Sequence, residues 1–277
     1  MISTFQFAVV ICTGSYHTPL PYQAMMDHLA ARGIESHCPQ RPSCDLKNLN
    51  VGDVNNPDFS REPPAGGYPP AAADAAVVGD VLDRLIDEGK SVVLVGHSSG
   101  GWVAAEAAKP ERQVQNRALI GKPGGVVGIF LYGAFIIPAG ESVTTFFAKA
   151  GTSNDTSHWL KFHENGLVTP LDTHLHLFSD VDEETGKKWG ATLTAEAFMT
   201  SPLTHDPWSA LPCAYVVMER DAILPPAYQE GMIAAQSQTS GRTFKVYRAP
   251  YGHEPNVSWP EGLAEKIEEF GREVLAQ

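Results

Sequence analysis

Short, continuous runs of apolar and β-branched residues recur along the chain. They lie at residues 5–11, 91–95, 126–132, 214–218 and 243–247. A continuous apolar run, in contrast to an alternating one, is typical of a strand that is covered on both faces in a parallel sheet. The pattern therefore predicts at least these buried strands.

Between these runs, apolar residues recur at the spacing of a helix. The helical stripes are Met25, Met26 and Leu29; Val78, Leu82, Leu85 and Ile86; and Leu263, Ile267, Phe270 and Val274. Pro21 suits the first turn of the first helix, and Gly33 and Gly89 suit the ends of the first and second. Strands that alternate with helices predict an α/β fold with a doubly wound, mostly parallel sheet.

One long segment departs from this alternation. Residues 138–204, called the lid segment here, contain no clear buried strand but many aromatic and histidine side chains. Long insertions between sheet elements usually have a functional role, and aromatic content argues against disorder. We therefore expect a core of residues 1–137 and 205–277 with an inserted lid at 138–204. Residues 44–70, rich in Pro, Gly, Asn and Asp, predict a coiled surface loop.

Charge and cysteine content limit the partners and the cellular compartment that we expect. The 20 Lys and Arg against 32 Asp and Glu give the 277 residues a formal charge of −12, which excludes phosphate backbones and anionic membranes as natural partners. Four scattered cysteines indicate reduced thiols, with a Cys38–Cys44 bridge as the alternative. The first apolar run is too short for a signal sequence or a membrane span. The expectation is a cytoplasmic protein, and a homodimer is compatible with this sequence.

The stretch Gly96-His-Ser-Ser-Gly100 has the G-x-S-x-G pattern between a predicted strand and a predicted helix. On such a turn the backbone is strained and the Ser98 hydroxyl is held out beyond the carboxyl end of the sheet. The alternative is a Gly-Ser turn that only allows the helix to pack close to the strand. The flanking strand and helix favour the first interpretation, in which Ser98 is a nucleophile.

A serine nucleophile needs a base and a carboxylate that orients the base. Asp221 follows the strand at 214–218, and His253 follows the strand at 243–247 in a loop rich in Gly and Pro. Both loops open at the same edge of the sheet as Ser98. The sequence therefore predicts Ser98, Asp221 and His253 as catalytic, with Glu219 as the rival carboxylate.

Two backbone amides are predicted to hold the oxyanion. One belongs to Ser99, directly after the nucleophile, and the other to Ser15, in the loop after the first strand. Gly14 allows that loop to approach the site closely. His17 could contact substrate, but a histidine that anchors its own loop is the commoner arrangement.

These residues together resemble the α/β-hydrolase superfamily. The segments are Thr-Gly-Ser-Tyr-His at 13–17, Gly-His-Ser-Ser-Gly-Gly at 96–101, Glu-Arg-Asp at 219–221 and Tyr-Gly-His at 251–253. The chain is similar to the branch of plant methyl-ester esterases and hydroxynitrile lyases and to fungal and bacterial secondary-metabolite hydrolases. The resemblance implies the α/β-hydrolase fold, the same catalytic serine, histidine and aspartate, and no cofactor. Thr13 and Ser99 depart from the residues usual in that branch, so the resemblance does not carry over a substrate.

The expected reaction is hydrolysis of a carboxylic ester or lactone through an acyl-enzyme. Trp159, Phe162 and Trp189 of the lid segment are predicted to contact a small hydrophobic substrate, including polyketide-like compounds. One alternative is a lyase or cyclase with His253 as general base, favoured if Lys149 or Lys161 reaches the site. The other is a ligand receptor without turnover.

No metal site is predicted. His174 and His176 would lie on one face of a strand, and His158 and His163 are five residues apart, which is not a common helical ligand spacing. Surface histidines are the better interpretation of both pairs. Apart from a second copy of the chain in a homodimer, the expected partner is a small hydrophobic ester or lactone.

Overall fold

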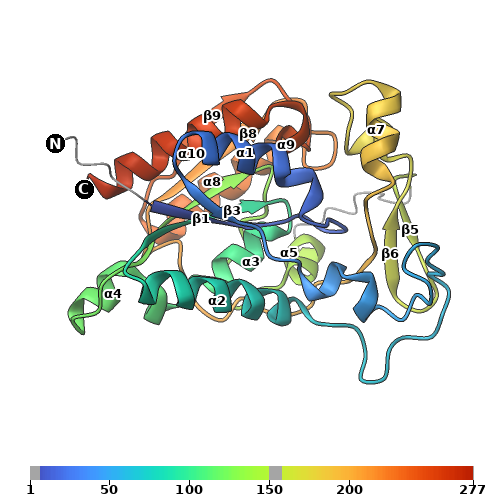
Figure 1. Cartoon of the computed structure of the whole chain (residues 1–277), viewed down its shortest axis with the longest axis horizontal. Coiled ribbons are helices and arrows are strands. Elements are labelled where there is room, and N and C mark those ends of the chain that lie inside the picture. Colours follow the sequence, from blue (N-terminus) through green and yellow to red (C-terminus); the bar gives the residue numbers. More distant parts are fainter. Residues whose placement is uncertain (1–6, 150–157, 277) are drawn as a thin grey trace.

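Six parallel strands form the centre of the protein (Figure 1). The computed structural model describes residues 7–149 and 158–276, and in it the strand order is β2-β1-β3-β4-β8-β9. The bounds are Phe7–Cys12 for β1, Glu35–His37 for β2, Ser91–His97 for β3, Gly125–Tyr132 for β4, Cys213–Met218 for β8 and Lys245–Ala249 for β9. The predicted doubly wound parallel sheet is confirmed.

All five predicted strands are present, with shifted ends. The last begins at Lys245, two residues later than predicted, and β3 continues two residues further, to His97. Residues 5 and 6 of the first predicted strand lie outside the described residues. The apolar pattern does not predict β2, because this edge strand consists of Glu, Ser and His. A strand at the edge of a sheet needs no apolar face of its own.

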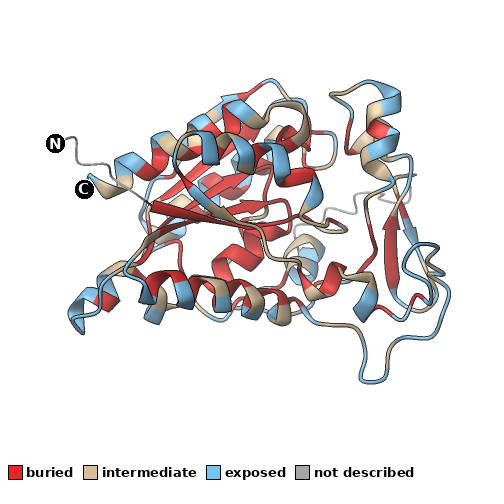
Figure 2. Cartoon of the chain, in the orientation of Figure 1, coloured by how far each residue is buried: buried red, intermediate tan, exposed pale blue. Residues whose placement is uncertain are grey.

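Helices cover both faces of the sheet, and the side chains of β1 show how. Phe7, Val9 and Ile11 pack toward one face and Ala8, Val10 and Cys12 toward the other, as the two-residue period of a strand requires. The first face is covered by α1 (Gln23–Ala31) and α10 (Pro260–Leu275), and the second by α2 (Ala71–Asp87), α3 (Gly100–Ala107) and α8 (Pro226–Ser240). The inner strands β1, β4 and β8 are buried throughout, whereas α1, α2 and α10 are buried on one side only (Figure 2). The short helices α4 (Val114–Leu119) and α9 (Pro255–Ser258) complete the core.

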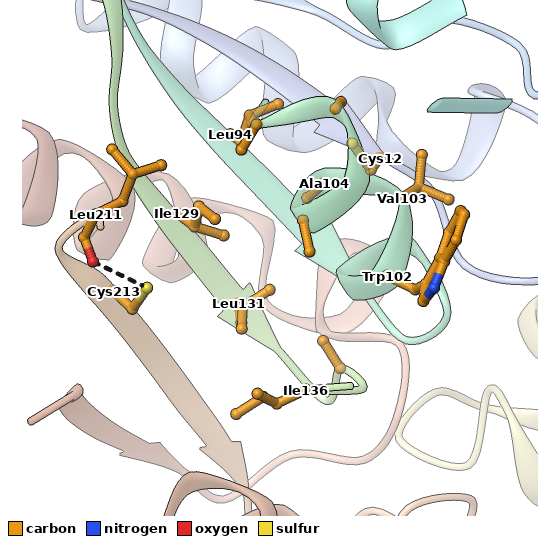
Figure 3. Packing of buried hydrophobic residues seen from close by; sticks show 14 of the residues in the cluster. Cys12, Leu94, Trp102, Val103, Ala104, Ile129, Leu131, Ile136, Leu211 and Cys213 are labelled. Carbon is orange, nitrogen blue, oxygen red and sulfur yellow. Dashed lines mark hydrogen bonds between the residues drawn. The ribbon is translucent and has the colours of Figure 1, made fainter. Parts of the chain in front are cut away.

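Helix α3 packs its apolar side chains directly onto the central strands. Figure 3 shows Trp102, Val103 and Ala104 of this helix beside Leu94 of β3 and, farther along the sheet, residues of β4. Trp102 is 1% exposed and Val103 is fully buried. The helix that begins after Ser98 is therefore fixed by the core.

The lid segment lies beyond the carboxyl ends of the strands, at the right of Figure 1. It contains α5 (Val143–Lys149), α6 (Thr173–His176) and α7 (Glu183–Gly190). It also contains an antiparallel sheet of β5 (Leu160–Phe162), β6 (Leu167–Pro170) and β7 (Glu196–Ala197). The expectation of no clear buried strand in this segment was wrong, because three of the four residues of β6 are buried. Strands of two to four residues are too short to give a recognisable apolar pattern.

The predicted surface loop follows Cys44. Apart from a short 3₁₀ turn at Leu46–Asn48, it has no helix or strand before α2. Asn165 of the lid segment donates hydrogen bonds to two of its carbonyls, those of Phe59 and Arg61, at 2.9 and 2.7 Å. All four cysteines are free thiols, so Cys38 and Cys44 form no bridge. Among the described helices, none combines the length and apolar character needed to cross a bilayer.

The start of α3 touches the end of β1. A Cβ atom on Gly100 would lie 2.1 Å from the carbonyl oxygen of Cys12 and 2.6 Å from that of Thr13. No side chain larger than hydrogen fits at those distances. Gly231, in the exposed middle of α8, has no neighbouring atom within 4 Å of such a Cβ.

We expect these two glycines to respond oppositely to alanine. Gly100→Ala should lower the free energy of unfolding by about 3 kcal/mol, because backbone atoms must move apart. Gly231→Ala should raise it by about 0.5–1 kcal/mol, because alanine loses less entropy in a helix. Urea unfolding of both variants tests this, and an unchanged stability of Gly100→Ala would contradict the packing described.

Candidate active site

The strand order creates a crevice at the carboxyl end of the sheet. From β1 the chain proceeds to β2 on one side, and the next strand, β3, lies on the other side of β1. The loops after β1 and β3 therefore diverge, and open α/β sheets bind ligands at such a point. Ser15 lies in the first of these loops and Ser98 follows the second strand.

Ser98 occupies a strained turn between β3 and α3. Its φ is +52°, a left-handed value that is unusual for a residue with a side chain. Gly14 allows the loop after β1 to rest against this turn, since a Cβ there would lie 3.1 Å from the Cβ of Ser98. The predicted strand-turn-helix context of Ser98 is thus present, and strain of this kind clusters at functional sites.

His253 and Asp221 meet at the same edge of the sheet. The Nδ1 atom of His253 lies 2.8 Å from Oδ2 of Asp221, and both residues are buried. The other carboxylate oxygen of Asp221 accepts hydrogen bonds from the amides of Ile223 and Leu224 at 2.9 and 2.8 Å. The carboxylate is therefore fixed. Because a carboxylate only accepts, Nδ1 carries the proton and Nε2 of neutral His253 is left with a lone pair.

Glu219, the rival carboxylate, points elsewhere. Its side chain is 44% exposed and forms an ion pair with Arg248 at 3.5 Å. The histidine is thus paired with Asp221, the first choice from the sequence.

Opposing effects act on the pKa of His253. Burial of the ring lowers the pKa, while the carboxylates of Asp221 and Glu254 raise it, and the net result lies above the ordinary value of 6.5. His97, the residue before Ser98, behaves in the opposite way. Its burial lowers its pKa to about 3, so this ring stays neutral.

A chain of hydrogen bonds passes through neutral His97. The Gly14 amide donates to the hydroxyl of Tyr22 at 2.9 Å, and this oxygen lies 2.8 Å from Nδ1 of His97. Nε2 of His97 lies 2.9 Å from the backbone carbonyl of His253. A carbonyl only accepts, so Nε2 carries the proton and Tyr22 donates to Nδ1. The chain links the loops that carry Ser15, Ser98 and His253.

His17 anchors its own loop, the commoner of the two arrangements expected from the sequence. Its Nδ1 donates to the carbonyl of Ser15 at 2.7 Å, and its Nε2 lies 3.1 Å from Oε1 of Glu254. Burial raises the pKa of Glu254, but His17 and the other neighbouring histidines outweigh it and lower that pKa to about 2. A charged carboxylate therefore lies beside the loop of Ser15.

The predicted oxyanion residues are neighbours. The Ser15 hydroxyl donates to the Ser99 hydroxyl at 2.8 Å, although the two residues are 84 positions apart. Within residues 7–149 and 158–276, no acceptor is hydrogen-bonded to the amide of Ser15 or of Ser99. Both amides thus keep hydrogen-bonding capacity, and they belong to two residues whose side chains are in contact.

A cavity of about 330 Å³ joins these groups to the lid segment. Ser15, His17, Ser98 and His253 line one wall, and the opposite wall is largely apolar. The apolar and aromatic residues include Phe135, Phe147, Trp159, Leu160, Phe162, Phe198 and Met199. None of the described lining residues is a lysine or an arginine.

The structure places the other predicted lid contacts differently. Trp189 lies half-buried on α7 and does not line this cavity. Lys149 forms an ion pair with Glu141, Lys161 is exposed on β5, and neither lines the cavity. Aromatic composition alone does not reveal which face of a helix meets a ligand.

The histidines of the lid segment form no metal cluster among the described residues. His174 and His176 lie on the short helix α6 and not on a strand, so the expectation that they share a strand face was wrong. The described residues contain one candidate group, His97, His253 and Glu254, whose ligand atoms lie within 4.8 Å of one another. Both ring nitrogens of His97 are already engaged in the hydrogen bonds above, so this group does not fit a metal.

Sequence reasoning missed four buried residues around the site. They are Tyr22 and His97 of the hydrogen-bond chain, Glu196 of the cavity lining, and Arg41, which is paired with Glu196. The position of His97, directly before Ser98 in the G-x-S-x-G pattern, is the local signal for this residue. No local signal marks Arg41 or Glu196, because they pair with residues distant in the sequence.

Known proteins share this arrangement of strands and loops. The sequence profile of the alpha/beta hydrolase family matches residues 9–266. The chain belongs to the alpha/beta hydrolase family. A relative, the alpha/beta hydrolase nvfD of Aspergillus novofumigatus, is 25% identical over 273 residues and covers 97% of this chain and 98% of its own.

Two further similar proteins carry esterase-type names. The pyrethroid hydrolase of Sphingobium wenxiniae is 26% identical over 286 residues, with 95% of this chain and 86% of its own covered. The crystal structure of polyneuridine aldehyde esterase has a TM-score of 0.69 at 15% identity, and covers 96% of this chain and 99% of its own. The latter likeness shows the fold.

The charges around His253 predict its titration. In an NMR titration of the histidine rings, we expect His253 to gain its proton above pH 6.5 and His97 only near pH 3. Asp221→Asn should lower the pKa of His253, because the carboxylate that stabilises the imidazolium is gone. Glu219→Gln is the matched control and should leave it unchanged. A His253 titration that does not respond to Asp221→Asn would rule out the pairing.

Proposed function

We propose that this alpha/beta hydrolase is a serine carboxylic-ester hydrolase with Ser98 as nucleophile, His253 as base and Asp221 as the orienting acid. One observation carries the proposal. The strained Ser98 shares a cavity with His253, and the Nδ1 atom of this histidine is held 2.8 Å from the buried Asp221. Such a combination of nucleophile, base and orienting carboxylate supports acyl transfer.

In the proposed mechanism, Ser98 Oγ attacks the carbonyl carbon while Nε2 of His253 takes its proton. The amides of Ser15 and Ser99 stabilise the oxyanion of the tetrahedral intermediate. His253 then gives the proton to the departing alkoxide, and an acyl-enzyme remains on Ser98. A water molecule, deprotonated by His253, attacks the acyl-enzyme and releases the acid. No step needs a cofactor.

The cavity supports a neutral, hydrophobic substrate. Its walls are mainly aromatic and aliphatic, and the described lining includes Glu196 but no cationic side chain to pair with a carboxylate. The formal charge of −12 also disfavours anionic ligands. We therefore propose an ester or lactone of a small hydrophobic metabolite, polyketide-like compounds included. The relatives named as a pyrethroid hydrolase and an aldehyde esterase support the ester class.

Two other functions have less support. A lysine of the lid segment at the site would favour a lyase or cyclase that uses His253 as base, and neither Lys149 nor Lys161 lines the cavity. A receptor that binds without turnover would not require a buried, oriented His253 beside a strained serine. Ester hydrolysis uses all of these features.

The nucleophile can be tested by covalent capture. A fluorophosphonate should label Ser98, and Ser98→Ala should lose the label and about five to six orders of magnitude of ester turnover while it folds normally. Ser209→Ala changes an exposed serine on the turn before β8. This control should keep both the fluorophosphonate label and the ester turnover. Retained turnover in Ser98→Ala would refute the covalent mechanism. Wild-type protein without turnover, yet stabilised by a hydrophobic ligand, would indicate a receptor.

The lid aromatics can be tested through substrate preference. Trp159→Ala and Phe162→Ala should lower kcat/KM for a bulky aryl ester about 10-fold, because they form the wall that such a group contacts. They should change the rate with a small activated acetate less than about twofold, because that substrate barely reaches the wall. Trp189→Ala is the matched lid variant outside the cavity and should change neither. Equal losses for every substrate would mean that these side chains serve stability alone.

A further inference from the structure

A buried arginine lies behind the two proposed oxyanion donors. The Arg41 side chain is 1% exposed and follows β2 in the sequence. Its Nη1 donates to the carbonyl of Thr13 and to the hydroxyl of Ser99, each at 3.0 Å. Its Nε donates to Asp74 of α2 at 3.0 Å, and its Nη2 pairs with Glu196 of the lid segment. The guanidinium group therefore has one edge toward the two segments that carry Ser15 and Ser99, called the oxyanion loops here. Its other edges face carboxylates.

The hydrogen bonds of Arg41 Nη1 hold the two segments that carry the Ser15 and Ser99 amides. Thr13 precedes Gly14, and their shared peptide is held on both sides, by Arg41 at its oxygen and by Tyr22 at its amide. The next peptide, joined to this one through Gly14, carries the N–H of Ser15. The Ser99 hydroxyl receives hydrogen bonds from Arg41 and from Ser15 together. One guanidinium group thus connects the loop after β1, which carries the Ser15 amide, to the turn after β3, which carries the Ser99 amide.

The same arginine connects these loops to the lid segment. Its partner Glu196 belongs to β7 and also lines the cavity. Two residues earlier, the Thr194 hydroxyl and amide donate to the carbonyl of Tyr16 at 3.0 and 2.7 Å, in the oxyanion loop itself. Tyr16 has a left-handed φ of +67°. The lid segment therefore holds a strained part of this loop in place.

Stability alone does not account for this charged cluster. Burial of a charge costs several kcal/mol, and apolar replacements of similar volume are often as stable as a buried ion pair. A planar group that donates in several fixed directions, however, can set the relative positions of four neighbours, which no apolar side chain can do.

We propose that Arg41 is a positioning residue that aligns the Ser15 and Ser99 amides for the oxyanion and ties their alignment to the lid segment through Glu196. The inference rests on the proposed function, since it assumes that these amides stabilise an oxyanion. Arg41 does not touch the substrate. It acts through Thr13 and Ser99.

The test compares two buried arginines. Arg41→Lys keeps a positive charge but cannot reach all of the partners, whereas Arg117→Lys makes the same change at the opposite end of the sheet. Arg117 is 5% exposed and bonds to the carbonyls of Ile86 and Pro123 and to Asp87. We expect Arg41→Lys to lower kcat for an activated ester by about 10- to 100-fold with KM within about twofold. Arg117→Lys should lower stability and leave kcat unchanged.

The affinity for two inhibitors distinguishes a loss of oxyanion positioning from a general loosening of the site. A trifluoromethyl ketone forms a tetrahedral oxyanion on the serine, and its methyl ketone counterpart binds chiefly as a ground-state analogue. Arg41→Lys should weaken the first by the same factor as kcat/KM and leave the second unchanged. Equal weakening of both ketones, or an unaltered kcat, would overturn the role of Arg41.

A second variant keeps the test decisive if Arg41→Lys does not fold. Ser99→Ala retains the amide and the buried cation but removes the hydroxyl that Arg41 holds, and we expect kcat to fall about 10-fold with KM unchanged. Full activity in Ser99→Ala would overturn the inference. Wild-type protein that neither hydrolyses esters nor reacts with a fluorophosphonate would overturn the proposed function and this inference together. If the wild type is active and Arg41→Lys has the same kcat, only this inference is overturned.

Discussion

The contact between the start of α3 and the end of β1 determines the geometry of the whole site. Because Gly100 packs against the carbonyls of Cys12 and Thr13, the helix begins immediately after β3 and leaves room for only a tight turn. Ser98 therefore adopts a left-handed φ of +52°. The same contact brings Ser99 beside Ser15, so the turn and the loop after β1 are positioned as one unit. The core packing of Trp102 and Val103 prevents the helix from moving away to relieve the strain.

Charged groups gather around this turn in places that water does not reach. Asp221 and Arg41 are 4% and 1% exposed. Burial of each ion costs several kcal/mol, and a hydrogen bond to a charged group returns about 1.5–3 kcal/mol, so each ion needs two or three good partners. Asp221 has the amides of Ile223 and Leu224 as well as His253. Partners fixed to this degree leave little freedom for the site to rearrange, which suits a site that must be ready before substrate arrives.

The sequence predicted those parts of the molecule that have a local cause. A continuous apolar run predicts a buried strand, and the G-x-S-x-G pattern between strand and helix predicts the turn at Ser98. Asp221 and His253 could be named because each follows a predicted strand at the same edge. The edge strand β2 and the lid strands escaped prediction, since they are short or polar and their pairing is decided by neighbours.

Arg41 shows why the remaining parts of the site were out of reach. Its partners Asp74, Ser99 and Glu196 are 33, 58 and 155 positions away along the chain. No pattern within a window of one helix or strand can relate residues so far apart. The placement of Trp159 in the cavity and of Trp189 outside it has the same origin, because it depends on how the lid segment packs and not on residue type.

The two walls of the cavity differ in how much change they tolerate. Ser98 and His253 are 6% and 1% exposed in the core, whereas Phe162 and Phe198 of the lid segment are 48% and 58% exposed and stack on each other. A substitution at an exposed position usually alters stability by less than about 0.5 kcal/mol, and a large-to-small change in a core costs about 2–5 kcal/mol. Phe162 and Phe198 are therefore free to vary with little effect on folding, while the serine and the histidine are not. Glu196 of the same segment is less free to vary, because it is 3% exposed and bound to Arg41. A lid of this kind can change what the cavity accepts at its aromatic end and remain fixed where it meets the oxyanion loops.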